Sequence, residues 1–115
     1  METNLLQFSE RDNTLFCLFT GKLDGYVCSE IEQDLLQSVS QFKSRHETIQ
    51  IVFDLTEVVY ISSAFLRICL ICHRTMGCNS FSITNASEPM YNVFRISGFA
   101  EMMNVTPAIR TPETA

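Results

Sequence analysis

Two short runs of alternating apolar residues open the chain, at residues 5–9 and 14–19, and the segment Glu-Arg-Asp-Asn separates them. A hydrophobic period of two is typical of a half-buried strand, and Asp and Asn favour tight turns. These runs therefore predict an N-terminal β-hairpin.

The next apolar residues recur at helical spacing, with acidic residues and glutamines between them. They are Ile31, Leu35, Val39 and Phe42. This pattern predicts an amphipathic helix that buries one stripe. Ser29 and Glu32 have the spacing of a capping box, so the helix is predicted to begin near Ser29 or a residue or two earlier.

The central part of the chain predicts a buried strand followed by a second helix. Residues 48–55 are apolar on both faces, as in a central strand that is covered on at least one side. A further apolar run ends at Ser62 and Ser63, and a helical pattern at 63–76 follows at once. This helix is apolar on most sides. Beyond the side that faces the sheet, its surface is covered either by the neighbouring helix or by a protein partner or weak homodimer.

Residues 79–86 alternate again and predict a strand with Phe81 and Ile83 inward. A helix over 87–98 is predicted next, with Ser87 as its N-cap and Gly98 just past its end. Residues 99–105 suggest a last helical turn, and residues 106–109 a short final strand.

The alternation of these elements predicts one α/β domain. Its sheet is small and mixed, with at most five strands, and its helices pack mainly on one face. The domain spans residues 1–108, and residues 109–115 form a polar C-terminal tail.

Charge and hydropathy narrow the class of partner. The formal net charge is −5, and the eight basic residues are scattered, which argues against nucleic-acid binding. The N-terminus lacks the basic and apolar regions of a signal peptide, and the densest apolar run is short and interrupted by Arg67. We therefore expect a cytoplasmic protein that does not insert into a membrane.

The five cysteines of the chain are predicted to be free thiols without a disulfide, because their number is odd and there is no export signal. Cys69, Cys72 and His73 share one helical face, with Cys78 shortly after, but a helical C-x-x-C lacks the loop that usually brings both sulfurs to one ion. We expect no metal, and no cofactor, since the four glycines form no phosphate loop.

A catalytic role for the double serine is disfavoured. His46 lies in a charged loop, and His73 follows Ser63 by ten residues on one helix, about 15 Å away at the usual helical rise. We expect no enzymatic activity. The remaining roles are a helix cap and a phosphorylation site, because a helix N-terminus tolerates added negative charge.

Four stretches together resemble the STAS domain, the domain of bacterial anti-sigma factor antagonists. Residues 54–69 resemble its strand-serine-helix signature, residues 19–25 its first turn, and residues 85–99 its later helix. The segment Met-Met-Asn-Val resembles its closing segment. The resemblance covers essentially the whole chain.

The resemblance implies a non-enzymatic module that binds an anti-sigma factor of the serine-kinase type, with a PP2C-type phosphatase as a further partner. Ser63 falls on the position phosphorylated in switchable members, and Ser62 on a position that is usually Asp. Ala64 takes the next small position, Phe65 replaces a Gly, and Asp24 falls near the partner surface. The alternative is a constitutive STAS adaptor of a transporter ATPase or signalling scaffold.

Arg67 extends this hypothesis from the residues themselves. It follows Ser63 by four positions, so both side chains share one helical face. A phosphate on Ser63 would then be held by first-turn N–H groups and by the Arg67 guanidinium. The expected partner-binding residues are Asp24, Ser62, Ser63, Ala64, Phe65 and Arg67.

Overall fold

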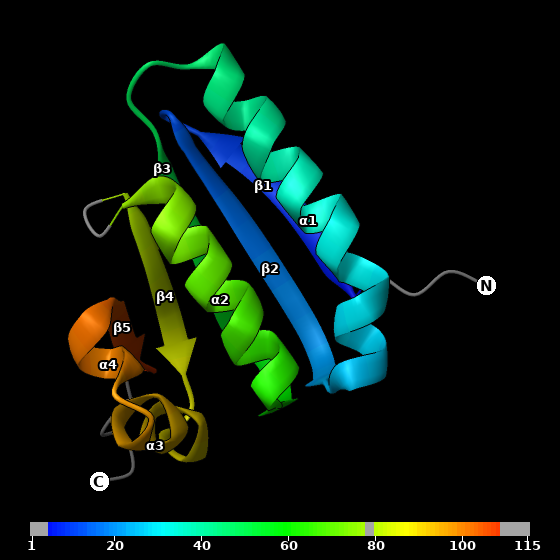
Figure 1. Ribbon diagram of the computed structural model, residues 1–115, viewed down its shortest axis with the longest axis vertical. Helices are drawn as coiled ribbons and strands as arrows, with labels where there is room; N and C mark the ends of the chain where they lie inside the picture. The colour runs from blue at the N-terminus through cyan, green and yellow to red at the C-terminus, as the bar shows by residue number, and fades with distance from the viewer. Residues whose placement is uncertain (1–4, 78–79, 109–115) are drawn as a thin grey trace, which may run out of the picture.

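The structure is a computed structural model that describes residues 5–77 and 80–108. Its five-stranded sheet has the order β1-β2-β3-β4-β5 (Figure 1). β1 pairs with β2 in antiparallel fashion, and the remaining pairs are parallel. The strands are β1 (Leu6–Arg11), β2 (Thr14–Leu23), β3 (Gln50–Ile61), β4 (Phe81–Ala86) and β5 (Asn104–Pro107).

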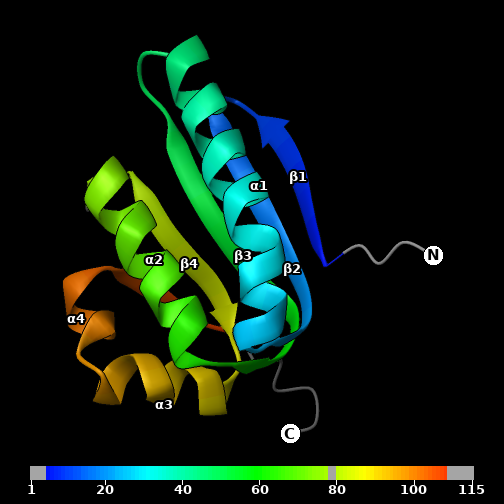
Figure 2. The ribbon, with the colours of Figure 1, turned by 45° about the vertical axis from the view of Figure 1, so that its right-hand side comes forward.

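Helices α1 (Gly25–Arg45) and α2 (Ser63–Met76) lie side by side across one face of the sheet (Figures 1 and 2). The shorter α3 (Glu88–Ile96) and α4 (Phe99–Met102) pack near β4 and β5. This arrangement confirms the prediction of a small mixed sheet with helices mainly on one face. No helix within the described ranges is long and apolar enough to cross a membrane.

The predicted hairpin forms because its turn residues accept left-handed backbone angles. Asp12 and Asn13 have φ values of 51° and 62°, as a two-residue hairpin turn of type I′ requires. β2 then runs beyond the predicted end at residue 19 and continues to Leu23.

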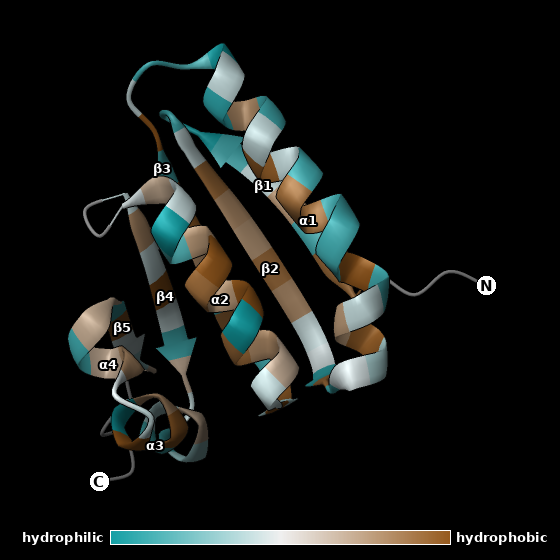
Figure 3. Cartoon of the chain, in the orientation of Figure 1, coloured by the Kyte–Doolittle hydropathy of each residue, from teal (hydrophilic) through white to brown (hydrophobic). Residues whose placement is uncertain are grey.

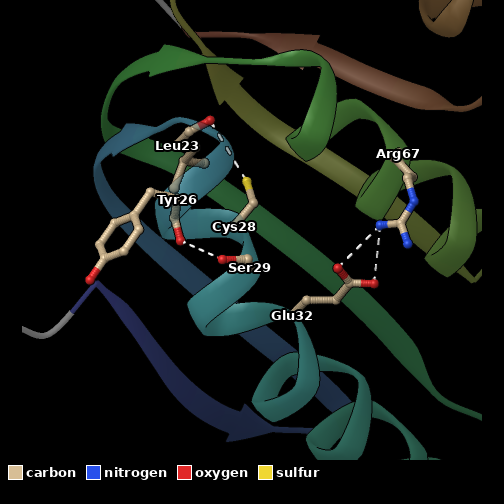
Figure 4. Close-up of polar contacts among 6 residues, drawn as sticks. All are labelled: Leu23, Tyr26, Cys28, Ser29, Glu32 and Arg67. Carbon is tan, nitrogen blue, oxygen red and sulfur yellow. Dashed lines mark hydrogen bonds and ion pairs between the residues drawn. The ribbon is translucent and has the colours of Figure 1, made fainter.

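The prediction that the first helix begins at a capping box of Ser29 and Glu32 is wrong. α1 begins at Gly25, and Asp24 is its N-cap. The Ser29 hydroxyl instead donates to the Tyr26 carbonyl at 2.9 Å, inside the first turns of the helix (Figure 4). The Asp24 carboxylate, directly before the helix, already supplies the acceptor for a first-turn N–H group that a capping box would have supplied.

The segments predicted as a strand over 48–55 and a separate apolar run form one strand, β3. Its register with β2 shifts between Leu18 and Thr20 and again between Gly21 and Lys22. These irregularities interrupt the alternation, so that Val58 and Ile61 are both buried while Val59 and Tyr60 are exposed. The φ of +90° at Gly21 suits a glycine at such a bulge.

The core lies between the sheet and the two long helices, where apolar residues run along β2 and the facing sides of α1 and α2 (Figure 3). Phe19, Phe53 and Phe81 form a row of edge-to-face rings on neighbouring strands, with centroids 4.9 and 4.8 Å apart. The predicted stripe of the first helix is buried: Ile31, Leu35, Val39 and Phe42.

The C-terminal elements follow the prediction with shifted boundaries. Ser87 is the N-cap of α3, although it makes no side-chain capping bond, and Gly98 has the left-handed conformation expected just past a helix end. The last helical turn, α4, stops at Met102 rather than near residue 105, and β5 begins at Asn104 rather than residue 106. The predicted tail, residues 109–115, lies outside the described residues.

Candidate functional site

The N-termini of α1 and α2 meet at one edge of the sheet. β2 and β3 are parallel, and their last residues, Leu23 and Ile61, are register partners. Asp24 and Ser62 follow these residues directly and are the N-caps of the two helices. The structure therefore brings together two stretches that are about forty positions apart and that the sequence analysis associated with one site.

Ser62 connects the start of α2 to the end of β2 by two hydrogen bonds. Its hydroxyl donates to the Leu23 carbonyl at 2.7 Å, and its main-chain N–H donates to the same oxygen at 3.1 Å. The Ser62 carbonyl accepts the first helical bonds, from Phe65 and Leu66. The expectation that a serine side chain caps the helix is therefore wrong, since the Ser62 hydroxyl binds the neighbouring strand and makes no capping bond.

Ser63 is the first residue of α2, and its side chain is exposed. Within the described residues its hydroxyl has no hydrogen-bond partner, in contrast to that of Ser62. The hydroxyl stands at the positive end of a 14-residue helix, where added negative charge is stabilised. The geometry thus separates two adjacent serines, one held by a strand and one open to solvent.

Asp24 acts on its own helix. Its carboxylate accepts from the Val27 N–H at 2.9 Å, and its carbonyl accepts from the Cys28 N–H at 2.9 Å. A cap of this kind is typically worth about 1 kcal/mol. The side chain is half-buried, so one carboxylate both orders the start of α1 and stays accessible beside the start of α2.

Phe65 does not lie on the surface where it was expected. Its side chain is fully buried, and its ring meets Phe19 edge to face with centroids 5.2 Å apart. The prediction that Phe65 contacts a partner is therefore wrong: a ring that faces the sheet from α2 fills the core. Ala64 is half-buried and packs against the same core.

Arg67 is paired across the two helices. Its Nη1 lies 3.1 and 3.2 Å from the two carboxylate oxygens of Glu32 on α1 (Figure 4). Sequence reasoning had assigned Glu32 to a capping box and so missed this partner. Glu32 stands at the third helical position after Ser29, and only the side-by-side placement of the helices reveals its role.

The thiols near the site are buried in the core. Cys28 donates to the Leu23 carbonyl at 3.7 Å, and burial raises its pKa, against a hydrogen bond with Ser62 that lowers it. Burial also raises the pKa of Cys72 to about 12 and that of Cys69 well above its usual range. Such thiols are poor ligands and nucleophiles. Cys78 lies outside the described residues, and the absence of a disulfide and of a metal stays a prediction.

Three large side chains at this end of the sheet escaped sequence reasoning. Tyr26 is 73% exposed, Val59 72% and Tyr60 50%. Tyr26 belongs to the first turn of α1 and points away from α2 (Figure 4), and Val59 and Tyr60 lie near the end of β3. A hydrogen bond to Glu30 raises the pKa of the Tyr26 phenol. Sequence reasoning gave these three residues no role, and the register shifts between β2 and β3 leave Val59 and Tyr60 exposed.

No protein-family model matches this sequence, and no curated protein matches it either. Solved structures do match. An anti-sigma factor antagonist from Mycobacterium paratuberculosis is 16% identical, with a TM-score of 0.76, over 90% of this chain and 86% of that one. A STAS domain protein from Planctomyces limnophilus is 12% identical, with a TM-score of 0.66, over 95% and 93%.

The phosphorylated form of the Bacillus cell fate determinant SpoIIAA is 19% identical, with a TM-score of 0.63, over 95% of each chain. At these identities the likeness concerns the fold. The chain has the STAS-like fold of anti-sigma factor antagonists, as the four sequence stretches indicated.

Proposed function

We propose that this chain is a non-enzymatic, cytoplasmic interaction module of the anti-sigma factor antagonist type, switched by phosphorylation of Ser63. Its partner would be an anti-sigma factor of the serine-kinase type, and a PP2C-type phosphatase would reverse the modification. One observation carries the proposal: Ser63 presents an exposed hydroxyl at the start of α2, while the Ser62 hydroxyl is held by Leu23.

The covalent step has ordinary chemistry. The kinase removes the proton from the Ser63 hydroxyl, and the oxygen forms a bond to the γ-phosphorus of a nucleoside triphosphate. The bond from that phosphorus to the bridging oxygen breaks, and the nucleoside diphosphate leaves. About −1.5 to −2 charges are added at the first residue of the helix, where the dipole and free N–H groups favour them.

The surroundings of Ser63 suit a switchable contact. Ala64 beside it is small, the Asp24 carboxylate is accessible, and Tyr26, Val59 and Tyr60 offer apolar area at the same end of the sheet. Aromatic side chains are enriched at protein interfaces. A phosphate placed among these groups would oppose a partner by charge and bulk without entering the core.

The test begins with capture of partners from the native host by the wild-type chain, followed by intact-mass analysis of the captured chain. Ser63→Ala, Ser63→Asp and Ser62→Ala are then compared for partner affinity and melting temperature. Ser63→Asp should lose the partner and melt near the wild type. Equal binding by Ser63→Asp, or modification of Ser62 by the cognate kinase, would refute the assignment. A partner bound without modification of either serine would favour the constitutive adaptor.

A further inference from the structure

We propose that Arg67 exchanges its partner when Ser63 is phosphorylated: Glu32 holds it in the unmodified protein, and the phosphate takes it afterwards. The inference rests on the proposed function only in taking Ser63 as the modified residue. It adds Glu32, and with it helix α1, to the part of the molecule that the modification changes.

The starting state is the ion pair between α1 and α2. Both Glu32 oxygens accept from the same nitrogen, Nη1 of Arg67, so the pair lacks the two-nitrogen fork that makes an arginine–carboxylate contact strong (Figure 4). The Arg67 side chain is 61% exposed and that of Glu32 25%. A partly exposed pair of this geometry contributes little stability and is readily replaced.

The alternative position is within reach. Ser63 and Arg67 are four residues apart on one helix, so their Cβ atoms are about 5–6 Å apart on the same face. Ser63 is exposed, and a phosphate on its oxygen projects further from the helix than the hydroxyl does. The long arginine side chain can therefore reach it by a change of rotamer, with both helices in place.

The phosphate should prevail in this competition. It carries a larger charge than one carboxylate and offers three acceptor oxygens in a geometry that matches the guanidinium fork. The other titratable groups close to the start of α2 are the Asp24 carboxylate, the Cys28 thiol, and the register partners Lys22 and Tyr60 near the ends of β2 and β3. Among these groups, Arg67 is the cation that shares a helical face with Ser63.

The exchange of partners by Arg67 would also change the surroundings of Glu32 on α1. Glu32 lines a groove on α1 together with Ser29, Gln33, Leu36 and Gln37. When Arg67 leaves, this carboxylate stays unpaired and the ion pair between α1 and α2 is lost, while Lys43 on α1 still donates to the Thr75 carbonyl on α2. A partner would then meet added negative charge on both helices.

The first test installs phosphoserine at position 63 during synthesis of the full chain, so it needs neither kinase nor partner. Titration by ³¹P NMR gives the second pKa of the phosphate, which is about 6 without neighbours. Arg67→Gln should raise this pKa by about 0.5 or more, because the cation favours the dianion. Arg74→Gln, an exposed arginine further along α2, is the matched control and should leave it unchanged.

A double-mutant cycle then measures whether Arg67 is paired with Glu32 in the unmodified and in the phosphorylated protein. Glu32→Gln, Arg67→Gln and the double variant are melted in the unmodified and the phosphorylated forms. The coupling between positions 32 and 67 should be present without phosphate and absent with it. An unchanged coupling, or a phosphate pKa that does not respond to Arg67→Gln, would overturn the exchange. Either result would leave Ser63 as the switch, which partner binding tests separately.

Discussion

The hydroxyl of Ser62 donates to the main-chain carbonyl of Leu23 at 2.7 Å, across the boundary between α2 and β2. The same oxygen accepts from the Ser62 N–H and from the Cys28 thiol. One carbonyl thus connects the end of β2 with the starts of both long helices. This connection gives the first serine a structural role, while the side chain of Ser63 stays exposed.

Ser62→Ala should lower the free energy of unfolding by about 1 kcal/mol, because it removes one hydrogen bond from a partly buried carbonyl. Ser63→Ala should stay within about 0.5 kcal/mol of the wild type, since the side chain is exposed. Denaturant unfolding of the two variants measures the difference. Equal losses in both would contradict the division of roles between the serines.

Phe65→Ala should cost about 3–5 kcal/mol, as expected for a phenylalanine removed from a packed core. Its ring contacts those of Phe19 and Phe53, so the cavity would open at the centre of the aromatic row. Phe65→Leu, which keeps much of the volume, is the control and should cost clearly less. A Phe65→Ala protein as stable as the wild type would contradict the burial of this ring in the core.

The order and type of the elements could be predicted because hydrophobic period and turn residues are local signals. The apolar stripe from Ile31 to Phe42 was sufficient to predict helix α1, and the turn residues Asp12 and Asn13 were sufficient to predict the β1–β2 hairpin. The start of α1 was misplaced because Asp24 and Ser29 are both good capping residues, and sequence alone does not show which one the chain uses.

The site was predicted less well because its contacts join distant residues. The resemblance brought Asp24 and Ser62 to one site, and the parallel register of β2 and β3 agrees. The role of the Leu23 carbonyl as an acceptor could not be predicted, because main-chain groups are the same in every residue. Glu32 and Arg67 are thirty-five positions apart, and their pairing depends on how two helices lie on the sheet.

The buried thiols should resist modification in the folded protein. Cys17, Cys69 and Cys72 are fully buried, and with a pKa of about 12 the Cys72 thiol is almost wholly protonated at neutral pH. Site-resolved mass spectrometry after brief alkylation should find these three unlabelled in buffer and labelled in denaturant. Rapid labelling of Cys69 or Cys72 in buffer would show that α2 opens away from the sheet.

Acid should destabilise the protein partly through Asp54, which joins two of the stretches that resemble the STAS domain. Its Oδ1 accepts from the N–H and the hydroxyl of Thr56 at 3.0 and 2.6 Å, and from the Asn85 amide at 3.1 Å. Burial raises the pKa of Asp54, but these hydrogen bonds outweigh it and hold the pKa below its usual range. The carboxylate is thus favoured in the folded state.

The lowered pKa of Asp54 makes the free energy of unfolding depend on pH in the acid range. Between the ordinary aspartate pKa of about 3.9 and the lower folded value, the unfolded chain binds more protons, so stability falls as the pH falls. Asn85→Gly removes one donor while it suits the φ of +60° at that position, and it should make this fall shallower. Asp54→Asn should abolish the contribution of this group. The measurement is the free energy of unfolding from pH 6 down to the acid transition, and equal slopes in the wild type and Asp54→Asn would show that Asp54 does not contribute.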